Sequence, residues 1–362
     1  MLNYVHSSFY YLNIKDVEII MLSLQFDEQL CVTCPTCDCL VKCQYIEIDR
    51  KTAQKEVLKM IKGEESFVLH ECTTCYACEE YCKRGNHPFY LIADLQEKKG
   101  ILASPKPMTR QWINMTLPTK KDFPQFYAAT EPAISLCVFP EYITDINESE
   151  LFDELSIIIG RYFFCQLVYL HLGKPSITRE RLVNVIKDIA NHEFKELVLF
   201  HDECYSTFTS YASAYGIEVP FKPIHFFEYL HNKLKKFKDK IKPLNIKVAY
   251  QRSCSCRLTP EIEHFVDDIF ELIGAKRVSR KFVGENSLCC AGIIRGLQKY
   301  DLYVDIQKKN VDDMVSAGAE YCVFNCPMCY SSLSEAVSKK GIQPIMMHQL
   351  CQLAIGEKKV KR

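Results

Sequence analysis

Two stretches of the chain repeat one another, LFHDECYS at residues 199–206 and FNCPMCYS at residues 324–331. The alignment places Cys204 on Cys329, and in both copies the dipeptide Gly-Ile begins twelve residues after that cysteine. Each copy then reaches a histidine that opens an apolar helix. These coincidences in one register indicate two related lobes, of which one kept its cysteines and the other lost most of them.

Apolar runs of strand length alternate with amphipathic helices around the first copy, at residues 134–139, 151–159, 167–170, 179–189 and 197–200. The same pattern restarts near Lys247. Such alternation is typical of βαβ units and a parallel sheet. We therefore expect an α/β fold, with a first lobe over residues 132–243 and a second lobe over residues 244–355.

The composition excludes several classes of protein. With 45 basic and 45 acidic residues the chain is formally neutral, so no nucleic-acid surface is indicated. Its apolar runs fall short of the ~20 residues that cross a bilayer. The N-terminus lacks the pattern of a secretory signal, and we expect Met21 to be the biological start. In such a chain, 20 cysteines indicate metal binding in the reducing cytoplasm, with membrane association only through a partner subunit.

Nine of the cysteines lie between residues 31 and 82. The last four follow the spacing C-x2-C-x2-C-x3-C, at Cys72, Cys75, Cys78 and Cys82. This is the bacterial ferredoxin run, in which three thiolates hold one [4Fe–4S] cubane and the fourth reaches a second cluster. Structural zinc prefers paired C-x2-C groups, so the triplet favours iron–sulfur clusters.

An upstream group repeats part of this spacing at Cys31, Cys34 and Cys37. In the interleaved arrangement, the upstream triplet and Cys82 hold one cubane, and the downstream triplet and a later cysteine of the first group hold the other. The expected position of that cysteine is occupied by Val41. The nearby thiols are Cys39 and Cys43, of which we favour Cys43.

Helical spacing at residues 53–62 links the two cysteine groups, and a second helical stretch at 88–98 follows them. We therefore expect residues 21–100 to form an α-rich, ferredoxin-like domain with two [4Fe–4S] clusters. The proline-rich segment 101–131, which contains Trp112, is the expected linker to the first lobe.

A different cysteine motif lies in the second lobe. It comprises a vicinal pair with thiols before and after it, namely Cys254, Cys256, Cys289, Cys290, Cys326 and Cys329. Vicinal thiols cannot easily serve one tetrahedral ion, but they can bridge different irons of a larger cluster. The pair therefore argues against a plain zinc site.

The order of these cysteines resembles the cysteine-rich CCG domain of heterodisulfide reductase catalytic subunits. A two-cluster ferredoxin module followed by two such lobes resembles the D subunit of heterodisulfide reductase. It is also similar to the K subunit of the Dsr membrane complex, the glycerol 3-phosphate dehydrogenase C subunit and iron–sulfur subunits of lactate or glycolate oxidising systems. The resemblance covers residues 31–353 and implies a non-cubane [4Fe–4S] cluster at which a disulfide is reduced. Its implied ligands are Cys289, Cys290, Cys326, Cys329 and one of Cys254 or Cys256.

The chain departs from this pattern in both lobes. Ala291 follows the vicinal pair where the family has glycine, and a positive φ there would strain the backbone. In the first lobe, Cys137 and Cys204 match the leading and final cysteines, His201 replaces the partner of Cys204, and Cys165 is isolated. We expect no second non-cubane cluster in that lobe. Its remaining groups are either remnants or ligands of a single metal.

The resemblance implies an oxidoreductase subunit with the pair Cys289–Cys290 at its catalytic centre. Electrons from a flavoprotein, ferredoxin or membrane cytochrome subunit would pass through the two cubanes to the non-cubane cluster, whose substrate would be a disulfide or a thiol. An alternative is an iron–sulfur relay subunit of a flavin-dependent 2-hydroxy acid or glycerol 3-phosphate dehydrogenase. A third alternative is a zinc-binding scaffold protein.

Overall fold

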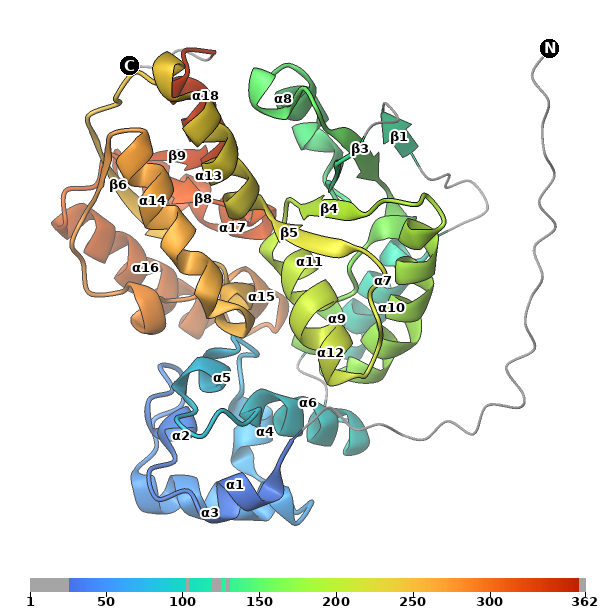
Figure 1. Ribbon diagram of the computed structural model, residues 1–362. Coiled ribbons are helices and arrows are strands. Elements are labelled where there is room, and N and C mark those ends of the chain that lie inside the picture. Colours follow the sequence, from blue (N-terminus) through green and yellow to red (C-terminus); the bar gives the residue numbers. More distant parts are fainter. Residues whose placement is uncertain (1–25, 102–103, 119–124, 128–130, 358–362) are drawn as a thin grey trace.

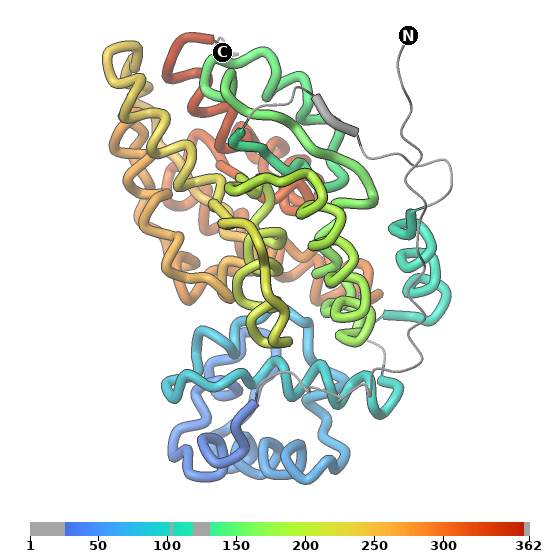
Figure 2. The backbone as a smooth tube through the Cα atoms, turned by 45° about the vertical axis from the view of Figure 1, so that its right-hand side comes forward, coloured from blue at the N-terminus to red at the C-terminus, as the bar shows by residue number. Residues whose placement is uncertain are grey.

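The computed structural model describes residues 26–101, 104–118, 125–127 and 131–357, so Met21 lies outside the described residues. An α-rich N-terminal region lies below two α/β lobes, which stand side by side in Figure 1. Figure 2 shows from a second direction that this region lies beneath both lobes. The described residues form two separate sheets, one of five strands and one of four.

The N-terminal region consists of short helices connected by the cysteine-bearing loops. They are α1 (Glu28–Val32), α2 (Asp38–Val41), α3 (Arg50–Ile61), α4 (Phe67–Glu71), α5 (Ala77–Tyr81) and α6 (Pro88–Lys98). Asp49 caps α3 by accepting the N–H groups of Lys51 and Thr52, while Pro88 occupies the first turn of α6. The two helices expected over residues 53–62 and 88–98 are α3 and α6.

The sheet of the first lobe has the strand order β1-β3-β2-β4-β5. Its strands are β1 (Gln125–Tyr127), β2 (Ala133–Ser135), β3 (Ser156–Ile159), β4 (Glu196–Leu199) and β5 (Lys222–His225). All pairings are parallel except that of β1 with β3. The helices are α8 (Ile143–Asn147), α9 (Val168–His171), α10 (Pro175–Ala190), α11 (Asp202–Ser206), α12 (Ala212–Ala214) and α13 (Phe226–Lys236).

The sheet of the second lobe is wholly parallel, with the order β7-β6-β8-β9. Its strands are β6 (Ile246–Gln251), β7 (Ala275–Arg277), β8 (Tyr321–Phe324) and β9 (Gln343–Met346). Its helices are α14 (His264–Leu272), α15 (Gly292–Gly296), α16 (Tyr300–Ser316), α17 (Pro327–Ser338) and α18 (Met347–Ala354). Every residue of β8 is buried, as expected for a central strand covered on both faces.

Shorter turns complete the two lobes. The 3-10 turns are Pro140–Tyr142, Glu150–Phe152, Arg161–Phe163, Lys238–Lys240, Cys254–Leu258, Pro260–Glu263 and Gly284–Asn286, and a π turn spans Thr207–Tyr211. Along the described ranges, none of the helices combines the length and the apolar character that crossing a bilayer requires.

The strand orders show the repeat directly, because β3-β2-β4-β5 in the first lobe corresponds to β7-β6-β8-β9 in the second. The mixed α/β class with parallel sheets is confirmed. Two local patterns differ from expectation. Residues 167–170, an apolar run of strand length, lie in the buried helical segment at α9, since a short, fully apolar run does not distinguish a strand from a buried helix. The expected linker 101–131 also contains a helix, α7 (Lys106–Thr116), and the strand β1.

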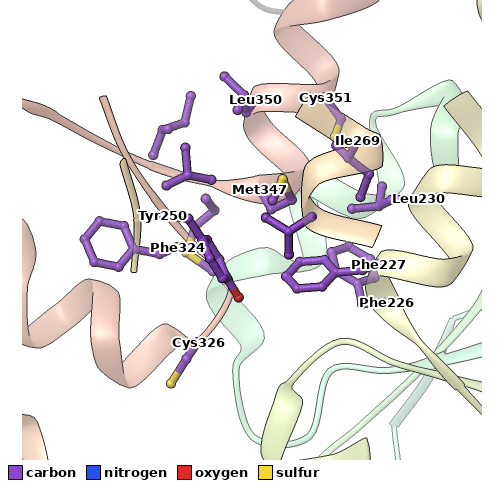
Figure 3. Close-up of a cluster of buried hydrophobic side chains, with 14 of the residues drawn as sticks. Phe226, Phe227, Leu230, Tyr250, Ile269, Phe324, Cys326, Met347, Leu350 and Cys351 are labelled. Atoms are coloured by element: carbon purple, nitrogen blue, oxygen red, sulfur yellow. The ribbon is translucent and has the colours of Figure 1, made fainter. Parts of the chain in front are cut away.

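The two lobes share one apolar core. Helix α13 of the first lobe packs against α14 and α18 of the second. Phe226, Phe227 and Leu230 of α13 therefore lie among Phe324 and Met347 of the second lobe (Figure 3). Burying each such side chain contributes roughly 1.5–3 kcal/mol, so this contact fixes the lobes relative to each other.

Candidate metal centres

The motif cysteines of the second lobe come from three loops at the carboxyl ends of its strands. Cys254 opens the turn after β6, and the pair Cys289–Cys290 directly precedes α15. Cys326 caps α17 and Cys329 lies in its first turn. The thiols of Cys289 and Cys329 hydrogen-bond to Cys290, and those of Cys326 and Cys329 to each other. The parallel sheet thus gathers five thiols at one edge, where α/β folds place their ligand sites.

Cys256 lies apart from this group. Its thiol donates to Asp202 Oδ1 at 3.4 Å, and burial followed by the charge of Asp202 raises its pKa. Cys254 instead lines the same cavity as Cys290 and Cys326. Burial, followed by the charges of Glu203, Cys290 and Cys326, raises its pKa. Of the two cysteines left open by spacing, the structure brings Cys254 to the vicinal pair.

Polar groups of the protein are directed at these sulfurs. Three backbone N–H groups donate to them: Ala291 to Cys289 at 3.3 Å, Gly292 to Cys290 at 3.5 Å and Cys329 to Cys326 at 3.4 Å. His201 Nε2 lies 3.2 Å from Cys326 Sγ. The hydrogen bond with Cys329 and the charge of His201 lower the pKa of Cys326, although burial opposes them. Donors of this kind stabilise the thiolate form that binds metal.

The residue after the vicinal pair has a left-handed backbone. Ala291 has φ 66°, a conformation that costs an L-residue with a Cβ roughly 1–2 kcal/mol. The strain foreseen for alanine at this position is therefore present. Gly292 follows it because a Cβ there would lie 3.2 Å from the side chain of Ser332.

The N-terminal cysteines form two neighbouring groups. In the first, burial followed by the charges of Cys82, Cys34 and Cys37 raises the pKa of Cys31 to about 11, although Asn86 Nδ2 donates to its sulfur at 3.2 Å. The upstream triplet therefore lies close to the last cysteine of the downstream run, as the interleaved arrangement requires.

In the second group, burial and the charge of Cys75 raise the pKa of Cys43 to about 11. Burial, followed by the charges of Cys75 and Cys43, also raises the pKa of Cys72. Burial, followed by the charges of Glu79, Cys72 and Cys75, raises the pKa of Cys78. Cys43 thus accompanies the downstream triplet. Burial, followed by the charges of Cys37 and Cys82, raises the pKa of Cys39, and the charge of Cys39 also acts on Cys78. Cys39 therefore lies near both groups.

The second group lies directly beside the second lobe. Tyr45, Cys75, Cys254 and Cys289 line one small internal cavity. The backbone N–H of Cys289 donates to the hydroxyl of Tyr45 at 2.9 Å. The tyrosine therefore stands between a cysteine of the ferredoxin-type run and the vicinal pair.

Buried ion pairs hold this contact together. The Glu80 carboxylate of α5 accepts hydrogen bonds from Arg252 at 2.8 and 3.0 Å and from Arg257 at 2.7 Å. Both arginines are almost fully buried. Arg252 also pairs with Glu263 at 2.7 Å, and Tyr81 donates to the carbonyl of Glu285. Because bidentate arginine–carboxylate pairs fix both distance and orientation, they set the position of the N-terminal region on the second lobe.

A cavity of about 530 Å³ lies between the lobes, within the size range of small-molecule sites. The five converging thiols of the second lobe lie along one side of it, together with Cys137 and His201 of the first lobe. Much of the remaining lining is apolar and includes Trp112, Phe139 and Met328, with Arg161 and Glu203 as charged groups. Trp112, Met115 and Thr116 belong to α7, so the expected linker supplies part of the wall.

The first lobe gathers a group of its own. The sulfurs of Cys137, Cys165 and Cys204 lie within 4.8 Å of one another, and all three residues are buried. Cys165 also lies within this distance of His201. The expectation that Cys165 is isolated is therefore wrong. It is separated from the others in sequence, but the loop after β3 returns it to the same sheet edge as the loops after β2 and β4.

The sequence analysis also did not identify the side chains that connect the N-terminal region and helix α7 to the lobes. Helix α7 had a signal, since Met108, Trp112 and Met115 follow helical spacing within the expected linker. No spacing rule identifies Tyr45, whose partner is 244 residues away. The same holds for the pairing of Arg252 with Glu80.

Comparisons with known proteins show which family and which solved structure this chain is similar to. Residues 248–334 match the model of the CCG family, the cysteine-rich domain. Among solved structures, the chain is similar to the crystal structure of a hypothetical protein from Helicobacter pylori, with 13% sequence identity and a TM-score of 0.50. The match covers 85% of this chain but only 65% of that one, and it shows the fold alone. No curated protein matches the chain.

The matched segment contains all six motif cysteines of the second lobe. Together with the other cysteine groups, it indicates an iron–sulfur electron-transfer protein, consistent with an oxidoreductase in general.

Proposed function

We propose that this chain is a heterodisulfide-reductase-like subunit that reduces a disulfide at the pair Cys289–Cys290. The observation that supports this most is the sequence of three thiol groups leading into one cavity. Cys39 lies near both N-terminal groups, the second group adjoins Cys289 through Tyr45, and the vicinal pair lines the cavity.

The donor sets fit the proposed clusters. Cys31, Cys34, Cys37 and Cys82 would hold one [4Fe–4S] cubane, and Cys43, Cys72, Cys75 and Cys78 the other. The five thiols Cys254, Cys289, Cys290, Cys326 and Cys329 would hold the non-cubane [4Fe–4S] cluster. When bound, these groups would supply single electrons to the sulfur atoms of a substrate.

The overall reaction balances as one disulfide, two electrons and two protons giving two thiols. Residues of the chain prepare the site for it. The N–H groups of Ala291 and Gly292 donate to the sulfurs of Cys289 and Cys290, and the hydroxyl of Tyr45 fixes the backbone of Cys289. The apolar lining from Trp112 and its neighbours excludes water and favours a disulfide whose flanking groups are apolar.

Electrons would enter from a partner subunit, which we propose to be a flavoprotein, a ferredoxin or a membrane cytochrome subunit. The first N-terminal group suits this contact, because Cys34 is only half-buried and the adjacent Val32 is exposed. Long-range transfer from there to the cavity needs no movement of the N-terminal region, since Glu80 holds it on the second lobe.

The test is disulfide reduction by the anaerobically purified full chain, with reduced methyl viologen as electron donor and dye oxidation as the readout. We expect Cys289→Ser to lose the activity. The electron paramagnetic resonance signals of the two cubane clusters should remain in this variant. Cys351→Ser is the matched control, because this thiol is buried in α18 away from the metal groups, and it should retain activity. An unchanged rate in Cys289→Ser would contradict the proposal. Co-purification with a flavin-dependent dehydrogenase, with no disulfide reduction, would favour a pure relay subunit.

A further inference from the structure

Two buried arginines stand between the second N-terminal group and the vicinal pair. Arg252 and Arg257 line the small internal cavity that also contacts Cys75, Cys254 and Cys289. The volume of this cavity is about 10 Å³, at the lower limit of the space that one water molecule needs. Positive charges therefore face the thiols across a gap with almost no room for water.

The carboxylates that pair with these arginines are placed differently. Glu80 accepts from Arg257 at 2.7 Å and from Arg252 at 2.8 and 3.0 Å. Glu263 pairs with Arg252 at 2.7 Å. Among the described residues, those that line the small cavity include neither of these carboxylates. Each ion pair therefore presents its positive end to the cysteines.

Arg257 is the arginine that acts on the second N-terminal group. Burial lowers the pKa of its guanidinium, but negative charges outweigh burial and raise it, with Cys75 first among them. The side chain therefore stays charged. At Cys43, burial and the charge of Cys75 raise the pKa of the thiol, and the charge of Arg257 opposes them. Arg257 thus affects two of the proposed ligands of one cubane.

Hydrogen bonds fix the guanidinium in this place. It donates to the carbonyls of Ser287 at 2.7 Å and Glu285 at 3.0 Å, and it lies 5.6 Å from the ring centre of Tyr81. Both carbonyls belong to the segment that leads to Cys289. One side chain therefore contacts the loop of the vicinal pair and also acts on the neighbouring cubane ligands.

An arginine beside the first N-terminal group is in a different environment. Arg84 donates to the hydroxyl of Thr33, next to Cys34, at 3.3 Å, and it is exposed. Water and salt screen a charge at the surface, whereas a buried charge is screened much less. The side chain of Arg257 is only 4% exposed, so its field on the neighbouring thiols is the stronger one.

We propose that Arg257 holds the reduction potential of the second N-terminal group above that of the first, so that electrons move downhill towards the vicinal pair. This rests on the proposed function, because each group must hold a [4Fe–4S] cluster. Reduction adds one negative charge to such a cluster, and a buried cation nearby stabilises that charge. The electron comes from the partner subunit and leaves in the thiols of the reduced disulfide, while Arg257 keeps its proton throughout.

The test is a redox titration of the anaerobically purified full chain, followed by electron paramagnetic resonance of the two cubane signals. We expect two separate potentials in the wild type. In Arg257→Gln the higher potential should shift to more negative values and the lower one should stay unchanged. Arg257→Lys keeps the charge and should restore most of the shift.

The partner carboxylate separates an electrostatic effect from a loss of structure. Glu80→Gln removes a negative charge, so it should shift the higher potential in the positive direction, opposite to Arg257→Gln. A merely loosened contact would move the potential in the same direction in both variants. Arg280→Gln is the matched control, because this buried arginine pairs with Asp313 at 3.4 Å outside the small cavity. It should leave both potentials unchanged.

The outcomes distinguish this inference from the proposed function. An unchanged potential in Arg257→Gln with its full iron content would overturn the inference and leave disulfide reduction at the vicinal pair untouched. So would a shift in the same direction in Arg257→Gln and Glu80→Gln. Absence of both cubane signals from the wild type would contradict the proposed function and this inference together.

Discussion

In both lobes the cysteines lie on loops that follow equivalent strands, but the donor side chains on those loops differ between the lobes. In the second lobe the turn after β7 brings Cys289 and Cys290 together, whereas the turn after β3 in the first lobe carries Phe164 and Cys165. At the start of the next helix, Cys326 in one lobe faces His201 in the other at 3.2 Å. A few side-chain differences on corresponding loops therefore separate the five-thiol group of the second lobe from the smaller thiol group of the first.

This difference has a consequence for how the molecule works. Two lobes with identical sites could each meet one half of a disulfide, but only the second lobe places a vicinal pair on the cavity. The first lobe contributes the opposite wall, including Phe139 and Phe164, and the histidine behind Cys326. We infer a division of labour in which the second lobe performs the sulfur chemistry and the first lobe shapes and supports it.

The largest expected effect comes from changing equivalent cysteines in the two lobes. Cys290→Ser should abolish disulfide reduction and lower the iron content from about 12 to about 8 atoms, since each [4Fe–4S] cluster contributes four. Cys165→Ser should keep the iron and most of the activity. Dye-coupled assays and metal analysis on the two variants measure this contrast. Equal loss of activity in both would remove the distinction between the lobes.

A second experiment attempts to convert the first lobe into the second. The double variant Phe164→Cys with His201→Cys supplies the missing vicinal thiol and the missing ligand of α11. We expect iron to rise from about 12 to about 16 atoms per chain. Each single variant serves as the control and should gain no iron. An unchanged iron content in a folded double variant would mean that the backbone of the first lobe, and not these two side chains, excludes a cluster.

The contact of the N-terminal region is made with the second lobe, and breaking it should have an intermediate effect. Glu80→Gln leaves Arg257 and Arg252 partly without a buried partner, and removing one member of such a pair costs about 3–5 kcal/mol. Chemical denaturation should show this loss, and electron transfer to the second lobe should slow. The exposed pair of Lys339 with Glu335 is the control, and Glu335→Gln should change stability little. A stability loss in Glu335→Gln equal to that in Glu80→Gln would contradict the account.

The smallest effect concerns the left-handed residues that follow Cys165 and Cys290. Ala291→Gly and Gln166→Gly should each relieve strain of roughly 1–2 kcal/mol, partly offset by the greater freedom of glycine in the unfolded chain. We expect a net gain of up to about 1 kcal/mol from thermal unfolding of each variant. A gain in only one lobe would show that the two turns are not equivalent.

The sequence was sufficient for the parts of the molecule that rest on periodicity and local spacing. The repeat around Cys204 and Cys329, helix α6 and strand β6 follow from patterns within a few residues. Cys43 could only be favoured over Cys39, and in the structure it accompanies the downstream triplet. These features are predictable because helix and strand periods act locally.

The features that could not be predicted depend on chain segments distant in sequence. Cys165 has no motif around it, and only the return of the chain after β3 brings it to Cys137. The choice of Cys254 over Cys256 depends on which thiol turns towards the cavity, and spacing did not decide it. The cavity wall from α7 required knowledge of the packing of Met108 against Gly296 in α15.

The central claim is that substrate sulfur binds at the vicinal pair of the second lobe. Electron paramagnetic resonance of the oxidised, anaerobically purified protein tests it most directly, with thiol added in steps. The account predicts a paramagnetic signal that changes on thiol addition and is absent from Cys289→Ser. About eight irons per chain with no thiol-sensitive signal would contradict it, and would leave a carrier with two cubane clusters.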